Sequence, residues 1–119
     1  MKIIILGRGN AGCISAMHFG YFRKFLNTKV EIELIYDSKI KPVPTGQGTT
    51  LAFPDWLFKN FGSNYVNKFS VTQKTGIMYE NWSKKNKKIF HGFPLGRYGI
   101  HFNPEDFQNF VCKNLKIDF

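Results

Sequence analysis

The first twelve residues constrain the fold of this chain more than any other stretch. An apolar run at residues 3–6 predicts a buried strand. The six residues that follow it are Gly7-Arg8-Gly9-Asn10-Ala11-Gly12. In this G-x-G-x-x-G spacing the first glycine permits a tight turn, the second lets the backbone approach a pyrophosphate, and the third lets a helix pack close to the strand. We therefore expect a dinucleotide-binding loop in which the helix N-terminus holds the diphosphate.

The next segment completes a strand–loop–helix–strand unit over residues 1–37. Residues 13–26 carry apolar and aromatic side chains at helical spacing, and residues 30–36 have the pattern of a second strand. Asp37 lies about as far from the glycines as the acid that hydrogen-bonds ribose hydroxyls in dinucleotide folds. These features predict a Rossmann-like α/β fold that binds either FAD or a nicotinamide dinucleotide. Asp37 also fits a simple turn opener, and the glycines fit a tight turn without a ligand.

Composition places the chain among globular proteins. Of its 119 residues, 43% are hydrophobic and 17% are aromatic, which is enough for one buried core. We expect a single, partial domain over residues 1–119, because a complete dinucleotide enzyme needs a further region. The apolar run at residues 3–6 is too short for a membrane span or a secretory signal. We therefore expect a cytoplasmic protein without membrane contact.

The cysteines and the charge point to no second site. Cys13 and Cys112 have no second Cys or His at a metal-ligand spacing, so we expect two small buried side chains in a reducing compartment and no metal. The formal net charge is +9, and residues 84–88 are the densest basic run. Basic runs are one signature of nucleic-acid binding. This one is short and lies between strand-like segments, which favours a solvated hairpin turn with Asn86 in a left-handed conformation.

The middle of the chain predicts a loop, short helices and one hairpin. The loop, residues 41–50, contains two prolines and two glycines whose amides can face a ligand closely. A helical and hairpin segment follows over residues 51–93. Its predicted elements are a helix at 54–61, a short helix at 63–70, a strand at 75–82 and a hairpin partner at 87–90. Residues 92–99 form a further loop punctuated by Gly and Pro.

The last predicted helix, residues 103–115, has a clear start signal. Asn103 is typical of an N-cap, and Pro104 suits the first helical position. Phe102 and Phe107 occupy the positions of a hydrophobic staple. Residues 116–119 predict the beginning of another strand.

In four segments, in the same order, the chain resembles the N-terminal FAD-binding part of the flavin-dependent tryptophan halogenase family. The first is the glycine motif at residues 7–12, and the second is the second strand with its acid, residues 34–38, followed by the loop that straps the flavin, residues 44–50. The third, residues 72–82, resembles the segment with the catalytic lysine, and the fourth, residues 98–103, resembles the approach to the next helix.

The resemblance implies an enzyme that uses reduced FAD, oxygen and halide to halogenate an electron-rich aromatic ring such as that of tryptophan or another indole. It also implies a separate flavin reductase that supplies the reduced FAD. Lys74 falls on the catalytic lysine, although it is also one of seventeen basic residues on a cationic chain. The implied cofactor-binding residues are Gly7, Gly9, Asn10, Ala11, Gly12, Asp37, Gly46, Gln47, Gly48 and Thr49.

Two departures from the family pattern affect the site. Thr49 stands where the family often has a glutamate, and Cys13 stands where it has a bulky Trp. The family's W-x-W-x-I-P motif and catalytic glutamate would lie beyond Phe119, so we expect an N-terminal fragment that is inactive alone. Two alternatives stay open. One is another FAD- or NAD(P)-dependent oxidoreductase, which does not need Lys74, and the other is a basic non-catalytic protein that binds nucleic acid through residues 84–88.

Overall fold

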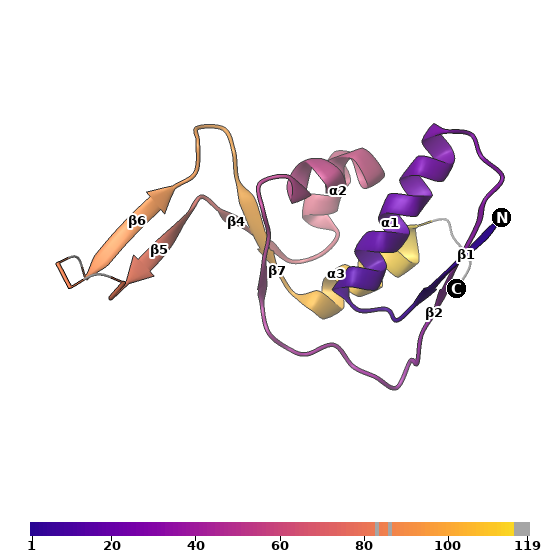
Figure 1. Cartoon of the computed structure of the whole chain (residues 1–119), viewed down its shortest axis with the longest axis horizontal. Helices are drawn as coiled ribbons and strands as arrows, with labels where there is room; N and C mark the ends of the chain where they lie inside the picture. The colour runs from indigo at the N-terminus through magenta and orange to yellow at the C-terminus, as the bar shows by residue number, and fades with distance from the viewer. Residues whose placement is uncertain (83, 86, 116–119) are drawn as a thin grey trace.

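The chain forms a βαβ unit, a group of helices around a small antiparallel sheet, and a hairpin that projects from them (Figure 1). The structure is a computed structural model, and it describes residues 1–82, 84–85 and 87–115. The turn conformation expected for Asn86 and the strand expected over 116–119 lie outside the described residues.

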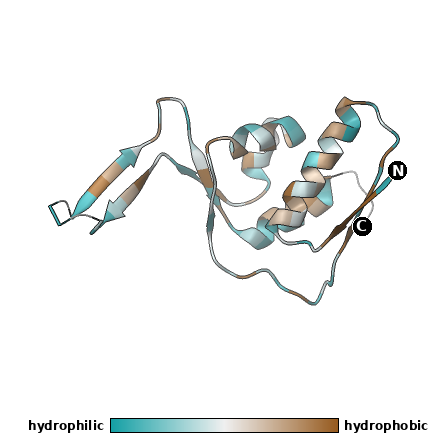
Figure 2. Cartoon of the chain, in the orientation of Figure 1, coloured by the Kyte–Doolittle hydropathy of each residue, from teal (hydrophilic) through white to brown (hydrophobic). Residues whose placement is uncertain are grey.

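The N-terminal unit consists of β1 (Lys2–Leu6), α1 (Asn10–Phe25) and β2 (Glu31–Ile35). The two strands pair in parallel, with Ile3 opposite Ile32. Figure 2 shows that β1 is hydrophobic over most of its length; its first residue, Lys2, is the exception. The helix begins at Asn10, three residues before the predicted start, because the last residues of the glycine motif already form its first turn. This unit confirms the predicted Rossmann-like α/β fold.

A three-stranded antiparallel sheet follows, with β7 between the two other strands. Its members are β3 (Gln47–Gly48), β4 (Val71–Lys74) and β7 (Gly99–Phe102). The sequence predicted none of these three strands. They are only two to four residues long, and each is held by a partner far away in the chain, such as Lys74 opposite Gly99.

The hairpin consists of β5 (Gly76–Glu80) and β6 (Lys88–Gly92). The strand predicted over 75–82 is β5, which is shorter by one residue at its start and by two at its end. The chain changes partner at Thr75: β4 pairs with β7, and β5 pairs with β6. Phe93 N donates to Thr75 O at 2.8 Å and closes the base of the hairpin. The predicted β-hairpin insertion is therefore present, with β6 extending two residues further than expected.

Two further helices and a 3-10 turn complete the fold: α2 (Phe53–Phe61), η1 (Gly62–Asn67) and α3 (Pro104–Asn114). The short helix predicted over 63–70 is this 3-10 element, which ends at Asn67. The predicted N-cap is confirmed, since Asn103 Oδ1 accepts from the backbone N–H groups of Glu105 and Asp106. The staple is present too, with the Phe102 and Phe107 ring centroids 5.0 Å apart.

The core lies where α1, α2, α3 and β7 meet, and it fixes α3 against α1. Its fully buried side chains include Met17 from α1, Leu57 from α2, and Phe107 and Val111 from α3. Rings of Phe53, Phe69, Phe102 and Phe110 pack around Phe107 or against one another. No helix among the described residues is long and apolar enough to cross a membrane.

Candidate functional site

The glycine loop between β1 and α1 has the geometry that its spacing predicts. Gly7 has φ +97°, a conformation that favours glycine, and its N–H donates to Ile35 O at 2.8 Å. A Cβ at Gly12 would collide with the carbonyl oxygen of Gly7. A Cβ at Gly9 would meet nothing within 4 Å. Gly7 and Gly12 are therefore required by the fold itself, whereas the open space at Gly9 is available to a ligand.

The N-terminus of α1 is open to an anion. Gly9 is its N-cap residue, no side chain caps the helix, and its first turn holds no acidic residue. The first N–H groups of a helix carry partial positive charge and need an acceptor. In α3 these groups are capped by Asn103, and the first turn carries Glu105 and Asp106. The two helices differ in the way expected if α1 receives its acceptor from a ligand.

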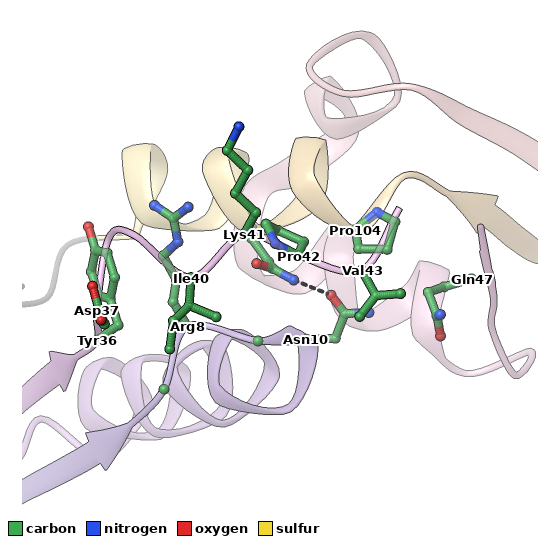
Figure 3. A pocket seen from close by; sticks show the side chains of 13 residues that line it. Arg8, Asn10, Tyr36, Asp37, Ile40, Lys41, Pro42, Val43, Gln47 and Pro104 are labelled. Atoms are coloured by element: carbon green, nitrogen blue, oxygen red, sulfur yellow. Dashed lines mark hydrogen bonds between the residues drawn. The ribbon is translucent and has the colours of Figure 1, made fainter. Parts of the chain in front are cut away.

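A cavity of about 430 Å³ lies directly in front of this helix N-terminus. Figure 3 shows Asp37 and Gln47 at its opposite ends, with Asn10 between them. Its volume is within the range usual for small-molecule sites. The lining residues are Gly7, Arg8, Gly9, Asn10, Tyr36, Asp37, Ile40, Lys41, Pro42, Val43, Gln47, Pro104 and Gln108.

Asp37 follows β2 by two residues and lies at one end of the cavity. Its Oδ1 accepts from Lys39 N at 2.8 Å, so the carboxylate does open a turn, as the alternative interpretation required. A carboxylate has further lone pairs, and Asp37 is exposed at the cavity, so the turn leaves it able to accept hydrogen bonds from a ligand. The guanidinium of Arg8 lies 4.8 Å from the centroid of the Tyr36 ring and adds a positive charge at this end.

Asn10 is held in place by α3. Its Oδ1 accepts from Gln108 Nε2 at 2.9 Å, and Gln108 is a buried polar residue of α3. These residues are 98 positions apart, so no local sequence signal pairs them. The bond ties the first turn of α1 to α3 across one wall of the cavity, and sequence reasoning missed Gln108 for this reason.

The predicted strap loop divides between the cavity and the sheet. Gln47 lines the cavity, and Gly46 does not. Gly48 pairs with His101 in β3–β7. Thr49 is engaged by β7, because its N–H donates to Ile100 O and its Oγ1 accepts from Ile100 N, both at 2.9 Å. The backbone and the hydroxyl of Thr49 therefore fix the loop to the sheet.

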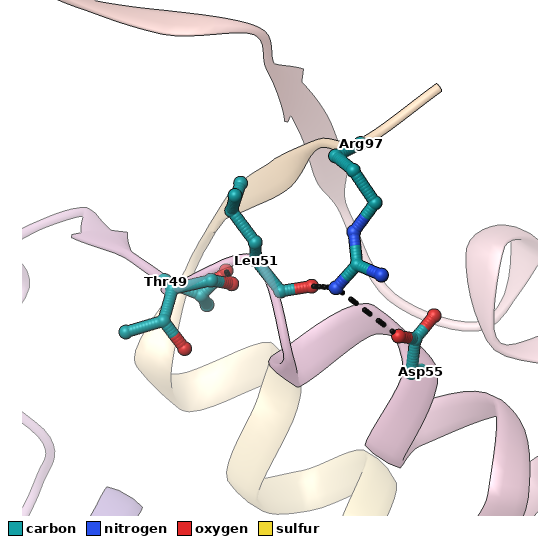
Figure 4. Close-up of polar contacts among 5 residues, drawn as sticks. Thr49, Leu51, Asp55 and Arg97 are labelled. Carbon is teal, nitrogen blue, oxygen red and sulfur yellow. Dashed lines mark hydrogen bonds and ion pairs between the residues drawn. The ribbon is translucent and has the colours of Figure 1, made fainter. Parts of the chain in front are cut away.

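The end of the strap is anchored a second time, by Arg97 (Figure 4). Arg97 Nη2 donates to Leu51 O at 3.4 Å and lies 3.6 Å from Asp55 Oδ2. These contacts join the loop before β7 to the start of α2. The strap is thus held by β7 at Thr49 and by Arg97 at Leu51. Gln47 is its residue that lines the cavity.

Lys74 lies at the end of β4, beside the strap and outside the lining of the cavity. Its Nζ is 5.7 Å from the centroid of the Phe93 ring and 3.5 Å from the position that a Cβ at Gly48 would occupy. The amine therefore lies beside Gly48 of the strap, and Lys74 is not among the residues that line the cavity.

Two other candidate sites gain no support. Lys88 in the basic run pairs with Glu80 at 3.1 Å across the hairpin, which fits a solvated hairpin better than a nucleic-acid surface. Among the described residues no group of three or more His, Cys, Asp or Glu side chains could hold a metal ion.

A family model for tryptophan halogenase matches residues 2–117, nearly the whole chain. The chain belongs to the tryptophan halogenase family.

Solved structures of halogenases share its fold. A tryptophan halogenase from Shewanella frigidimarina is 18% identical with a TM-score of 0.80, and the match covers 99% of this chain and 35% of that one. A flavin-dependent halogenase from Xanthomonas campestris is 16% identical with a TM-score of 0.81 over 98% of this chain and 34% of that one. A tryptophan 6-halogenase from Streptomyces toxytricini is 15% identical with a TM-score of 0.78, and the match covers 98% of this chain and 34% of that one. This family member therefore spans about a third of the length of the solved halogenases that it matches.

The glycine loop gives a first prediction, on stability alone. Gly12→Ala should lower the free energy of unfolding by about 2 kcal/mol or more, because the collision with Gly7 O outweighs the roughly 1 kcal/mol that alanine adds in a helix. Gly9→Ser is the matched control: its φ of −61° suits any residue, and a serine there can cap α1. Chemical denaturation measures both variants. Equal stabilities of the two would contradict the close packing of α1 on β1.

Proposed function

We propose that residues 1–119 form the FAD-binding portion of a flavin-dependent halogenase that acts on an electron-rich aromatic substrate, such as tryptophan or another indole. The observation that carries the proposal is the uncapped N-terminus of α1, which faces a cavity that ends at Asp37. Membership of the tryptophan halogenase family favours FAD over a nicotinamide dinucleotide. The similarity to the flavin-dependent halogenase from X. campestris supports the same choice.

The residues around the cavity fit the parts of a dinucleotide. Backbone N–H groups of Gly9, Asn10, Ala11 and Gly12, with Gly7 shaping the turn, would hold the pyrophosphate. Asp37 would accept hydrogen bonds from the ribose hydroxyls at one end. At the other end the strap of Gly46, Gln47, Gly48 and Thr49 would lie toward the flavin, with Gln47 as its cavity-facing side chain. Bound reduced FAD would supply the electrons with which oxygen is activated for the oxidation of halide.

Lys74 is the residue of this chain that we propose for the halogenation step. A lysine ammonium donates N–H groups, so Nζ would hydrogen-bond the oxygen of hypohalous acid and orient the electrophilic halogen toward the substrate ring. Its position beside the strap and outside the cavity lining supports the role, because the halogenating group then lies apart from the pyrophosphate end of the cofactor. The proposal includes a separate flavin reductase as the source of reduced FAD, a halide co-substrate, and a cytoplasmic location without a nucleic-acid partner.

Gly9 provides the most direct test of cofactor binding. Gly9→Asp places a carboxylate where the pyrophosphate would bind, so it should cap α1 and stabilise the chain by about 1 kcal/mol while it weakens FAD binding by at least about tenfold. Ala52→Asp adds the same charge at the exposed N-cap of α2 and should leave the FAD affinity unchanged. Quenching of flavin fluorescence measures the affinities. A Gly9→Asp protein that binds FAD as tightly as the wild type would refute the pyrophosphate site.

Asp37 variants separate a ribose ligand from a turn residue. Asp37→Asn keeps an oxygen that accepts from Lys39 N, whereas Asp37→Ala removes it. If the carboxylate binds ribose, both variants should weaken FAD binding by about 1–3 kcal/mol, the cost of losing a charge-assisted hydrogen bond. Calorimetric titration gives the two dissociation constants. Wild-type affinity in Asp37→Asn would mean that Asp37 serves the turn alone.

Lys74 is tested by separating product formation from flavin oxidation. Residues 1–119 alone, supplied with reduced FAD, halide and oxygen, should yield no halogenated indole, and a chain that also carries the remaining parts of the solved halogenases should yield it. In that longer chain Lys74→Ala should abolish product while oxygen consumption continues, and Lys68→Ala, at an exposed lysine, should leave both unchanged. Mass spectrometry on an indole panel measures the product. Halogenation by Lys74→Ala at the parental rate would show that another residue has this role.

A further inference from the structure

Two cysteines that are far apart in the sequence meet beneath the glycine loop. Cys13 lies on α1 and is fully buried, and Cys112 lies on α3 and is half-buried. Neither is in a disulfide. Cys112 packs against the core cluster that contains Cys13, and the two thiols share a hydrogen bond there. The sequence predicted two small buried side chains in a reducing compartment. The fold instead makes them a pair, with one member reachable from solvent.

The pair is connected to the cavity through Arg8. Cys13 Sγ donates to the backbone carbonyl of Arg8 at 3.3 Å, inside the glycine motif. The Arg8 side chain lines the cavity. One thiol proton therefore has two acceptors, the Arg8 carbonyl and Cys112 Sγ. A chemical change at the thiols removes a contact that holds the loop.

The two thiols have different reactivity. The hydrogen bond from Cys13 lowers the pKa of Cys112 to about 7, and the Arg8 guanidinium adds to this effect against the opposing cost of burial. The bond with Cys112 and burial hold the pKa of Cys13 well above its usual range. Cys13 from α1 and Arg8 from the glycine loop are the titratable and charged groups that act on Cys112. Near neutral pH, Cys112 is therefore the nucleophile and Cys13 the protonated partner.

We propose that Cys13 and Cys112 form an oxidisable dithiol, a modification site under the dinucleotide loop, which hydrogen peroxide converts to a disulfide. The Cys112 thiolate attacks peroxide and breaks its O–O bond, giving a sulfenic acid and hydroxide. The Cys13 sulfur then attacks the Cys112 sulfur and displaces the sulfenic oxygen, which leaves as water with the Cys13 proton. The two cysteines lose two electrons in total, and peroxide is reduced by two.

The disulfide removes the S–H that donates to Arg8 O, so oxidation loosens the glycine loop. This consequence rests on the proposed flavin function, whereas the oxidation itself does not. The thiols and the flavin are therefore measured separately.

The first experiment titrates the full chain with hydrogen peroxide and follows thiol content and intact mass. The expected result is the loss of both free thiols, a mass lower by two hydrogens in a monomer, and full reversal by dithiothreitol. The oxidation rate should rise about tenfold from about pH 6 to about pH 8, as for a thiol of pKa about 7, instead of the roughly eightyfold rise of an ordinary thiol. Thiols that persist, or disulfide-linked dimers, would overturn the proposal.

Single variants identify the roles within the pair. In Cys13→Ser the sulfenic acid on Cys112 has no partner, so dimedone should trap one adduct on Cys112. In Cys112→Ser the remaining Cys13 should resist peroxide, because it is fully buried and its burial still raises its pKa without Cys112. Circular dichroism confirms that each variant is folded. An adduct on Cys13 in the folded Cys112→Ser protein would contradict the assignment, and the wild-type mass shift stays decisive if a variant does not fold.

The last experiment measures the FAD affinity of the wild-type chain with Cys13 and Cys112 either as free thiols or as the disulfide. Oxidation should weaken binding about two- to tenfold, the effect of one hydrogen bond that supports the loop. Equal affinity of both forms would overturn the coupling of the dithiol to the loop. Failure of the reduced form to bind FAD would instead overturn the proposed flavin function, while the mass shift still reports the dithiol.

Discussion

Gly12 lies where the first turn of α1 passes the carbonyl oxygen of Gly7, and a side chain there would collide with that oxygen. Because Gly12 has none, the helix starts directly from the loop, and Gly7 N reaches back to Ile35 O at the end of β2. The direction of α1 follows from this contact, and so does the direction of its unsatisfied N–H groups. The position of α3 depends on it as well, since α3 packs on α1 through Met17, Phe107 and the Gln108–Asn10 bond.

The helices α1 and α3 differ in how the N–H groups of their first turns are satisfied. The N-terminus of α3 is capped by Asn103 and carries acidic residues, so its partial positive charge is compensated within the chain. The N-terminus of α1 lacks both and faces a cavity. A side-chain cap stabilises a helix. The absence of a cap at α1, beside a cavity, is therefore expected if these N–H groups bind an anion instead. The cysteine pair lies one contact away from this same end of α1, through the carbonyl of Arg8.

The βαβ unit could be predicted because its signals are local: three glycines at fixed spacing, an apolar run before them and an acid after the second strand. The N-cap and the staple of α3 were predictable for the same reason. The sheet of β3, β7 and β4 was not, because strands of two to four residues such as Gly99–Phe102 form only through distant partners. The contact of Gln108 with Asn10 and the contact of Cys13 with Cys112 were missed, because each joins a residue of α3 to one of α1. Lys74 was singled out only by family resemblance, since its own sequence context is that of any surface lysine.

The central claim is that the open N-terminus of α1 and Asp37 bind the two phosphates and the ribose of a dinucleotide. Titration of the isotope-labelled chain with ADP, followed through its backbone amide NMR signals, tests this claim most directly. ADP carries both groups without the flavin, so the account predicts large, saturable shifts at Gly9, Asn10, Ala11 and Gly12, with smaller ones near Asp37. Signals that stay in place there, or that move instead at Lys84, Lys85 and Lys87, would contradict it.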